Sequence, residues 1–219
     1  LRVLLLSALV VLLNGCAPKL TVFPEPLSVV RTTSTTDIKL YLGSVNVIGL
    51  STPLPDAERS VLEDVIISHL ERTQYFRSVQ RASARSMSEA GASLMMDVDV
   101  WPRETGEYRW SLTWPAIYPM IGYWPLQVRQ GNVSVSLKGT IYPEKRNVST
   151  QFSARKTRSY EVKLYGFYRT SPIEETIRQC YEEAIQDLAE QVVKEERLLA
   201  LLDAPARVPA AGPARPAVL

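Results

Sequence analysis

The sequence predicts an α+β domain: a mainly antiparallel sheet of about four to five strands, with two long amphipathic helices packed on it. Residues 94–100 alternate between apolar and polar side chains, which is typical of a strand with one buried face. Residues 57–73 and 172–203 repeat apolar residues every three or four positions, which is typical of a helix with one apolar stripe. The order strand, helix, strands, helix favours helices that lie together on one sheet.

The first half of the domain contains one strand and one long helix. Residues 38–49 are rich in apolar and β-branched residues and predict the opening strand. Asp56 is a candidate N-cap for the helix that follows. The predicted apolar stripe of this helix consists of Val61, Leu62, Val65, Ile66 and Leu70. A second short strand is expected near residues 76–79, and a short helix over residues 83–90.

The second half predicts a hairpin and a final helix. Residues 132–142 and 153–165 read as strands, and the polar turn that begins at residues 143–147 joins them as an antiparallel pair. The helix over residues 172–203 begins with proline in its first turn, where proline is tolerated. Its predicted apolar stripe consists of Ile173, Ile177, Cys180, Ala184, Ile185, Leu188 and Val192.

The chain starts with the features of a secretory signal. Arg2 precedes an apolar run, Val3–Leu13, which is shorter than the roughly 20 residues that span a bilayer. The segment Leu13–Cys16 resembles the lipobox of bacterial lipoproteins. This resemblance implies that Cys16 is acylated, begins the mature chain and anchors it stably in a membrane. Ala17 stands where aspartate retains such proteins in the inner membrane, so the resemblance points to the outer membrane and its periplasmic face.

Four regions follow from these patterns. We expect a signal peptide over residues 1–15, a lipidated cysteine with a flexible tether over residues 16–37, a periplasmic α+β domain over residues 38–203, and a disordered Ala/Pro-rich tail over residues 204–219. The tether is expected because prolines and a Ser/Thr run interrupt any regular pattern there.

Four parts of the domain resemble a known group of proteins. They are the segment VIGL at residues 47–50, ERSVLEDVIISHLERTQYF at residues 58–76, SLMMDVDV at residues 93–100, and the final helix. Their order is similar to that of periplasmic lipoproteins with a TolB amino-terminal-like fold, which include the curli secretion lipoprotein and the Pel polysaccharide-export lipoprotein. The resemblance covers Ile38–Val193 and implies a non-enzymatic role in envelope assembly or export, often as an oligomeric ring.

Residues 108–126 form an aromatic insert, which holds three of the four tryptophans of the chain. Its prolines exclude a regular helix or a central strand. Its aromatic side chains combine an apolar body with a polar tip and are favoured at interfaces. Three alternatives remain: a loop packed on the core, a contact with a subunit or partner, and insertion among lipid headgroups. The candidate contact residues are Trp110, Trp114, Tyr118, Tyr123 and Trp124.

The sequence offers little support for catalysis, a metal site or a cofactor. His69 is the only histidine and lies near an apolar stripe, so we expect a packed side chain. Motifs of the HExxH, paired CxxC, P-loop and GxGxxG types are absent from the sequence. The string Ser153–Lys156 matches SxxK, but a strand would place its serine and lysine on opposite faces. Asp97 and Asp99 share one strand face and could act as an acid–base pair or hold a cation, although a solvated face is the simpler interpretation.

The sequence therefore predicts a non-enzymatic, lipid-anchored component of an envelope assembly or export system. The net charge of +2 gives no strong attraction for nucleic acid. The expected partners are the membrane, through acylated Cys16, and copies of the chain or envelope proteins. One alternative is an export lipoprotein that contacts polysaccharide through the aromatic insert. The other is an envelope hydrolase that uses Asp97 and Asp99.

Overall fold

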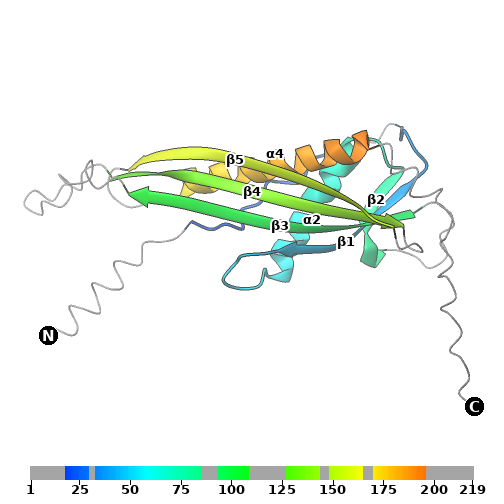
Figure 1. Ribbon diagram of the computed structural model, residues 1–219, viewed down its shortest axis with the longest axis horizontal. Coiled ribbons are helices and arrows are strands. Elements are labelled where there is room, and N and C mark those ends of the chain that lie inside the picture. The colour runs from blue at the N-terminus through cyan, green and yellow to red at the C-terminus, as the bar shows by residue number, and fades with distance from the viewer. Residues whose placement is uncertain are drawn as a thin grey trace, which may run out of the picture.

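The computed structural model describes residues 18–29, 33–84, 93–108, 127–143, 148–164 and 170–195. These residues form a five-stranded sheet with two long helices packed on it, which confirms the predicted α+β class (Figure 1). The strands are β1 (Lys39–Val47), β2 (Ser78–Arg81), β3 (Ser93–Tyr108), β4 (Gln127–Pro143) and β5 (Thr150–Leu164). The helices are α2 (Asp56–Arg72), α4 (Ser171–Lys194) and a short 3-10 turn, η1 (Ala82–Ala84).

The sheet is mixed, and its antiparallel part is the larger. The strand order is β2-β1-β3-β4-β5. The strands β3, β4 and β5 form two long antiparallel ladders along the long axis of the molecule (Figure 1). Strand β1 is parallel to both of its neighbours, β2 and β3. Helix α2 provides the crossover between β1 and β2 that a parallel pair requires.

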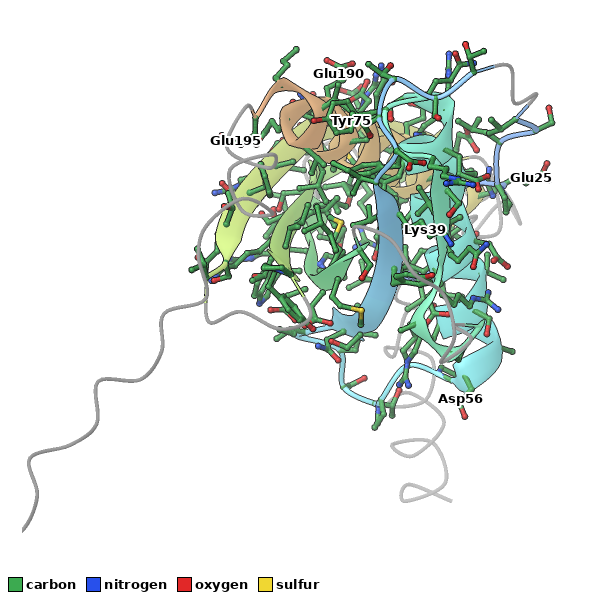
Figure 2. All side chains as sticks on the ribbon, turned by 90° about the vertical axis from the view of Figure 1, so that its right-hand side faces the viewer. Glu25, Lys39, Asp56, Tyr75, Glu190 and Glu195 are labelled. Atoms are coloured by element: carbon green, nitrogen blue, oxygen red, sulfur yellow. The ribbon has the colours of Figure 1, made fainter. Side chains whose placement is uncertain are left out.

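The core lies between one face of the sheet and the two helices. In β3, every second residue from Leu94 to Val100 is fully buried, as the alternation predicted. Figure 2, viewed along the long axis, shows side chains filling the space between the strands and the helices. Gly139 of β4 allows a close approach, because a Cβ at this position would lie 3.4 Å from Leu188 Cδ1 of α4 and 2.8 Å from Met96 Cε.

Helix α2 differs from the prediction at two positions. Pro55 occupies the N-cap, and Asp56 is the first helical residue, where its charge favours the positive end of the helix dipole. Val61, predicted in the apolar stripe, is 43% exposed. His69 instead belongs to the buried face and is only 4% exposed, as expected of a packed histidine. Burial, and secondarily the charge of Arg72, lowers the pKa of His69 to about 4.

Helix α4 buries the whole predicted stripe but ends earlier than predicted. All seven predicted stripe residues are buried, including Cys180, whose pKa is raised by burial. The helix ends at Lys194 because Glu195 adopts an extended backbone. Residues 196–203, which were expected to continue the helix, lie outside the described residues. The same holds for residues 85–90 of the predicted short helix, of which η1 covers only the beginning.

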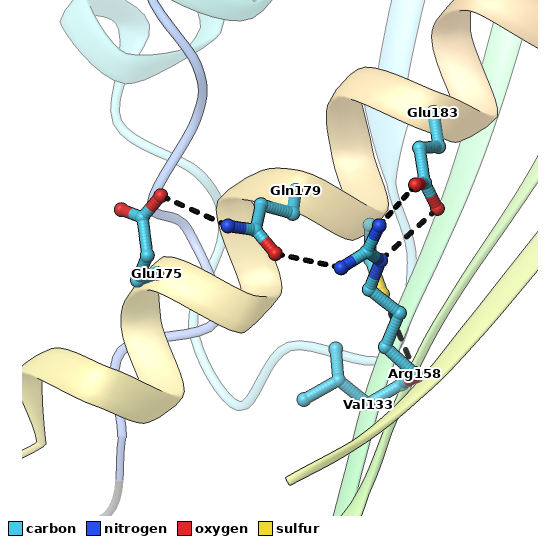
Figure 3. A network of polar contacts seen from close by, with 6 residues as sticks. Val133, Arg158, Glu175, Gln179 and Glu183 are labelled. Atoms are coloured by element: carbon cyan, nitrogen blue, oxygen red, sulfur yellow. Dashed lines mark hydrogen bonds and ion pairs between the residues drawn. The ribbon is translucent and has the colours of Figure 1, made fainter.

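A polar network attaches α4 to β5 (Figure 3). The Arg158 guanidinium donates to both carboxylate oxygens of Glu183, and its Nη1 donates to Gln179 Oε1 at 2.8 Å. Hydrogen bonding to Arg158 lowers the pKa of Glu183. Next to this network, Lys156 forms an ion pair with Asp187 at 3.2 Å. These pairs are partly exposed, so they fix the position of α4 on the sheet more than they stabilise the fold.

Candidate functional site

The residues predicted to contact a membrane or partner lie outside the described residues. This applies to Cys16 and to the five aromatic residues of the insert, Trp110, Trp114, Tyr118, Tyr123 and Trp124. The structure does describe the strands on both sides of the insert. Tyr108, the last residue of β3, pairs with Arg129 of β4, and Gln127 pairs with Leu164 of β5. The insert therefore starts and ends at the tip of the β3–β4 hairpin, at one end of the long sheet.

A buried charge cluster supports this tip. Arg129 Nη2 lies 2.8 Å from Glu104 Oε1, and the two side chains are only 10% and 11% exposed. The Tyr160 hydroxyl donates to the same carboxylate oxygen. The pKa of Tyr160 is raised, first by burial and then by its contacts with Glu104. A buried ion pair needs further hydrogen bonds to offset the cost of its desolvation. The hydrogen bond from Tyr160 supplies one of them to Glu104.

Two glycines make room for this tyrosine. Gly106 and Gly131 are directly paired in the β3–β4 ladder, and Gly131 is also paired with Tyr160. A Cβ on Gly131 would lie 2.2 Å from the Thr105 carbonyl oxygen and 2.8 Å from the Tyr160 hydroxyl oxygen. This cluster was not predicted from the sequence, although glycine in a strand often marks a close approach of two backbones. The result is a tightly packed base for the hairpin tip.

Residues 18–29 lie against both helices, whereas the sequence predicted a flexible tether there. Tyr181 of α4 donates a hydrogen bond from its hydroxyl to the Leu20 carbonyl oxygen, at 3.2 Å. The rings of Phe23 and Tyr181 meet edge to face, with centroids 5.0 Å apart. On α2, the Ser68 hydroxyl accepts a hydrogen bond from the Leu27 amide at 3.0 Å. Apolar side chains within a proline-rich stretch thus find partners on the domain.

The docked segment begins close to the predicted anchor. Pro18 is buried and only Ala17 separates it from Cys16. Lys19 forms an ion pair with Glu58 of α2 at 2.7 Å, which lowers the pKa of Glu58. In Figure 1, this blue segment begins in the half of the molecule toward which the β3–β4 hairpin tip points. The start of the segment and the ends of the aromatic insert therefore lie toward the same end of the long axis.

The two carboxylates considered for catalysis bind the neighbouring strands. Asp97 Oδ1 accepts hydrogen bonds from the amide and the hydroxyl of Ser44, at 2.7 and 2.9 Å. Its Oδ2 accepts one from the Tyr142 hydroxyl at 3.0 Å. Asp99 Oδ1 accepts from the Asn46 side-chain amide at 3.0 Å. These bonds secure β1 at the irregularity between Leu42 and Val45, so both side chains have a structural role.

The described residues also bear on membrane spans and metals. Neither long helix in this part of the chain combines the length and the apolar character needed to cross a bilayer. Among the same residues, His, Cys, Asp and Glu side chains do not gather in groups of three or more that could hold a metal ion. The SxxK serine and lysine lie on opposite faces of β5: Ser153 is exposed, and Lys156 faces α4.

Comparison with known proteins gives one family match and several loose structural similarities. A protein-family model matches residues 7–193. None of the curated proteins matches the sequence significantly. A Helicobacter pylori protein, described as a candidate neuraminyllactose-binding hemagglutinin homologue, is 15% identical, with a TM-score of 0.45, over 83% of this chain and 98% of its own.

Lipoproteins and an oligomeric protein are also among the similar solved structures. The PelC dodecamer from Paraburkholderia phytofirmans is 14% identical, with a TM-score of 0.34, over 74% of this chain and 94% of its own. The rare lipoprotein B from Shewanella oneidensis is 14% identical, with a TM-score of 0.30, over 69% of this chain and 96% of its own. Similarities at this level do not transfer a function.

Proposed function

The chain belongs to the protein family whose model matches residues 7–193, and from this premise we propose that it is a lipid-anchored accessory component of an envelope assembly or export system. The matched range includes the lipobox segment Leu13–Cys16 as well as the helices and strands of the domain up to Val193. The match therefore spans both the segment that resembles a lipobox and the folded domain.

The docked N-terminal segment is the observation that supports this proposal best. Acyl chains on Cys16 would enter the lipid two residues before Pro18, which is already buried against the domain. Such an anchor holds the domain at the membrane surface, with little freedom to move away. A protein with this geometry acts on what is next to it on the membrane.

The hairpin tip is the proposed contact region at that surface. Its aromatic insert starts from strands that are held rigidly by Glu104, Arg129 and Tyr160. A rigid base lowers the entropy lost when aromatic side chains bind a neighbour, which favours a contact with a second copy or an envelope protein. The lipid headgroup region is the second candidate, because the tip points toward the end of the long axis at which residues 18–29 begin (Figure 1).

The proposed role is non-catalytic and located at the periplasmic face of the outer membrane. The structural use of Asp97 and Asp99 argues against the hydrolase alternative, since both already bind β1. The second candidate role is contact with a polysaccharide through the aromatic insert.

Acylation provides the direct test. Metabolic labelling with a palmitate analogue should mark the wild-type chain, and Cys16→Ser should abolish the label and move the protein from the membrane pellet to the soluble periplasmic extract. Cys180→Ala is the matched control, because it removes the other cysteine and should keep both label and pellet. A label that persists in Cys16→Ser, or a wild-type protein without label, would reject the lipoprotein proposal.

The aromatic insert needs a separate test. Trp114→Ala and Trp124→Ala should leave the far-UV circular dichroism spectrum and the melting temperature unchanged while weakening crosslinking to a second copy or a co-purifying envelope protein. A large loss of stability would instead indicate that the insert packs on the core. Unchanged crosslinking, together with lost binding to lipid vesicles, would favour insertion among headgroups.

A further inference from the structure

The face of the sheet opposite the helices presents an unusual set of side chains near its centre. Trp101 of β3 pairs with Ser136 of β4, and Ser136 pairs with Arg155 of β5, so the three form one row across the sheet. Arg103 lies two residues along β3 from Trp101, and Lys138 lies two residues along β4 from Ser136. Side chains two residues apart share a face. We call Trp101, Arg103, Lys138 and Arg155 the cationic patch.

The cations of this patch lack partners within the described part of the chain. Arg103 and Arg155 are exposed, Lys138 is partly exposed, and none of them forms an ion pair or a hydrogen bond there through its side chain. On the same face, Asp99 lies directly across from Lys138 in the β3–β4 register, although these two side chains form no ion pair. Asp97 and Asp99 are bonded to Ser44, Tyr142 and Asn46 instead.

On the opposite face of the same strands, the cationic side chains do have carboxylate partners. Lys156 pairs with Asp187, Arg158 with Glu183, and Arg129 with Glu104. Arg155 and Lys156 are neighbours in sequence, yet the inward one has a carboxylate partner and the outward one has none. The outward-facing Arg103 and Arg155, which lie across from serines, are therefore available to an external anion.

The surroundings of these cations are hydroxyl-rich and hollowed. Trp101, Lys138 and Arg155 border an open hollow of about 430 Å³ on this face. Short hydroxyl side chains lie between and beside the cations, so the surface there is not covered by long side chains. These residues are Ser134, Ser136, Ser153 and Thr157. A partly exposed indole beside hydroxyls and cations presents stacking, hydrogen-bonding and charge recognition together.

We propose that the cationic patch binds an acidic polysaccharide. The indole of Trp101 stacks on the apolar face of a sugar ring, and Arg155, Lys138 and Arg103 pair with carboxylate or phosphate groups on successive units. Arg103 and Lys138 are four residues apart in register, or about 13 Å along the strands, which suits a short stretch of polymer. The proposal names a substrate class for the proposed export role and rests on it only for location.

Orientation favours a polymer over a lipid surface. The strands run along the long axis, and the docked segment next to Cys16 begins toward one end of that axis (Figure 1). The patch therefore faces sideways relative to the anchored end. A polymer that passes alongside the membrane-bound domain can reach this face, whereas the headgroups beneath the anchor cannot.

The test uses the full-length protein in non-ionic detergent, with oligogalacturonate as the acidic probe and a maltooligosaccharide of the same length as the neutral probe. We expect calorimetric binding of oligogalacturonate only, weakened by added salt. Arg155→Gln and Lys138→Gln should each weaken it several-fold, and Trp101→Ala about tenfold. Lys156→Gln is the matched control, because it removes the same charge from the opposite face and should bind as wild type.

Each outcome decides the proposal. Equal binding of both oligosaccharides, or equal losses in Lys156→Gln and Arg155→Gln, would overturn it. Binding to phosphatidylglycerol vesicles through the same residues, without binding to oligogalacturonate, would assign the patch to lipid instead. Circular dichroism of each variant separates lost binding from lost fold, and Arg155→Gln at an exposed position keeps the test valid if Trp101→Ala unfolds. The labelling of Cys16 is independent of every one of these results.

Discussion

Removing the Phe23 ring should measure how firmly the N-terminal segment is held. Phe23 is partly buried against the core and meets the Tyr181 ring edge to face at 5.0 Å. Truncating a fully buried phenylalanine costs about 3–5 kcal/mol, and an aromatic pair contributes about 0.5–1.5 kcal/mol beyond its buried area. For a partly exposed ring, we expect Phe23→Ala to lower the free energy of unfolding by about 2 kcal/mol.

The assay is urea unfolding of the purified protein, followed by circular dichroism, together with limited proteolysis of the folded state. Tyr181→Phe keeps the ring pair but removes the hydrogen bond to the Leu20 carbonyl, so it should cost about 1 kcal/mol. Glu25→Ala, at an exposed position of the same segment, should change stability by less than about 0.5 kcal/mol. Proteolysis within residues 18–29 should be faster in Phe23→Ala than in Glu25→Ala.

The reasoning fails if Phe23→Ala costs no more than Glu25→Ala and the segment is cut equally fast in both. The segment would then be a tether, as the sequence predicted, and the close attachment of the domain to the membrane would lose its support.

Three further changes probe other parts of the structure. Gly131→Ala should destabilise by about 1–3 kcal/mol in urea unfolding, because its Cβ would meet the Thr105 carbonyl at 2.2 Å; equal stability would contradict the packed base of the hairpin. Asp97→Ala should cost about 0.5–1.5 kcal/mol in thermal unfolding, since the hydrogen bonds to Ser44 are lost, and a neutral result would free this carboxylate for another role. His69 has its pKa lowered to about 4 from 6.5, so between these values the unfolded chain binds the proton more readily and stability falls as pH falls. The loss of stability is about 2 kcal/mol in wild type, and we expect His69→Leu to reduce it. Urea unfolding at pH 7 and pH 4.5 measures this loss, and an equal loss in His69→Leu and wild type would contradict the idea.

The helices and strands were largely predictable because their signal is local. The alternation in β3 and the stripe of α4 each follow from a residue and its near neighbours. The parallel pairing of β1 was not predicted, since strand order depends on contacts between distant segments. The end of α4 was missed for a related reason: helix-forming residues continue past Lys194, while the buried stripe reaches its last fully buried residue at Val192.

The candidate sites show the same limit. The alternation predicted over residues 94–100 stopped short of Glu104, and nothing local identified Arg129 and Tyr160 as its partners. Prolines and hydroxyl residues made the stretch after Cys16 resemble a spacer. The apolar residues Leu20 and Phe23 argued against a spacer. Their contact partner, Tyr181, is more than 150 residues away in the sequence, so no local pattern could reveal it. The cationic patch likewise required knowledge of which cations have partners across the sheet.

The contact between Leu20 and Tyr181 also sets an order of events in time. The two residues are 161 positions apart, and α4 is the last described helix of the chain. In a chain delivered from its N-terminus, residues 18–29 can contact α2 early, but Leu20 and Phe23 meet Tyr181 only once α4 has arrived. In a protein acylated at Cys16, the contacts with α4 therefore form late in folding. Completion of folding is the step that brings the domain close to its lipid anchor.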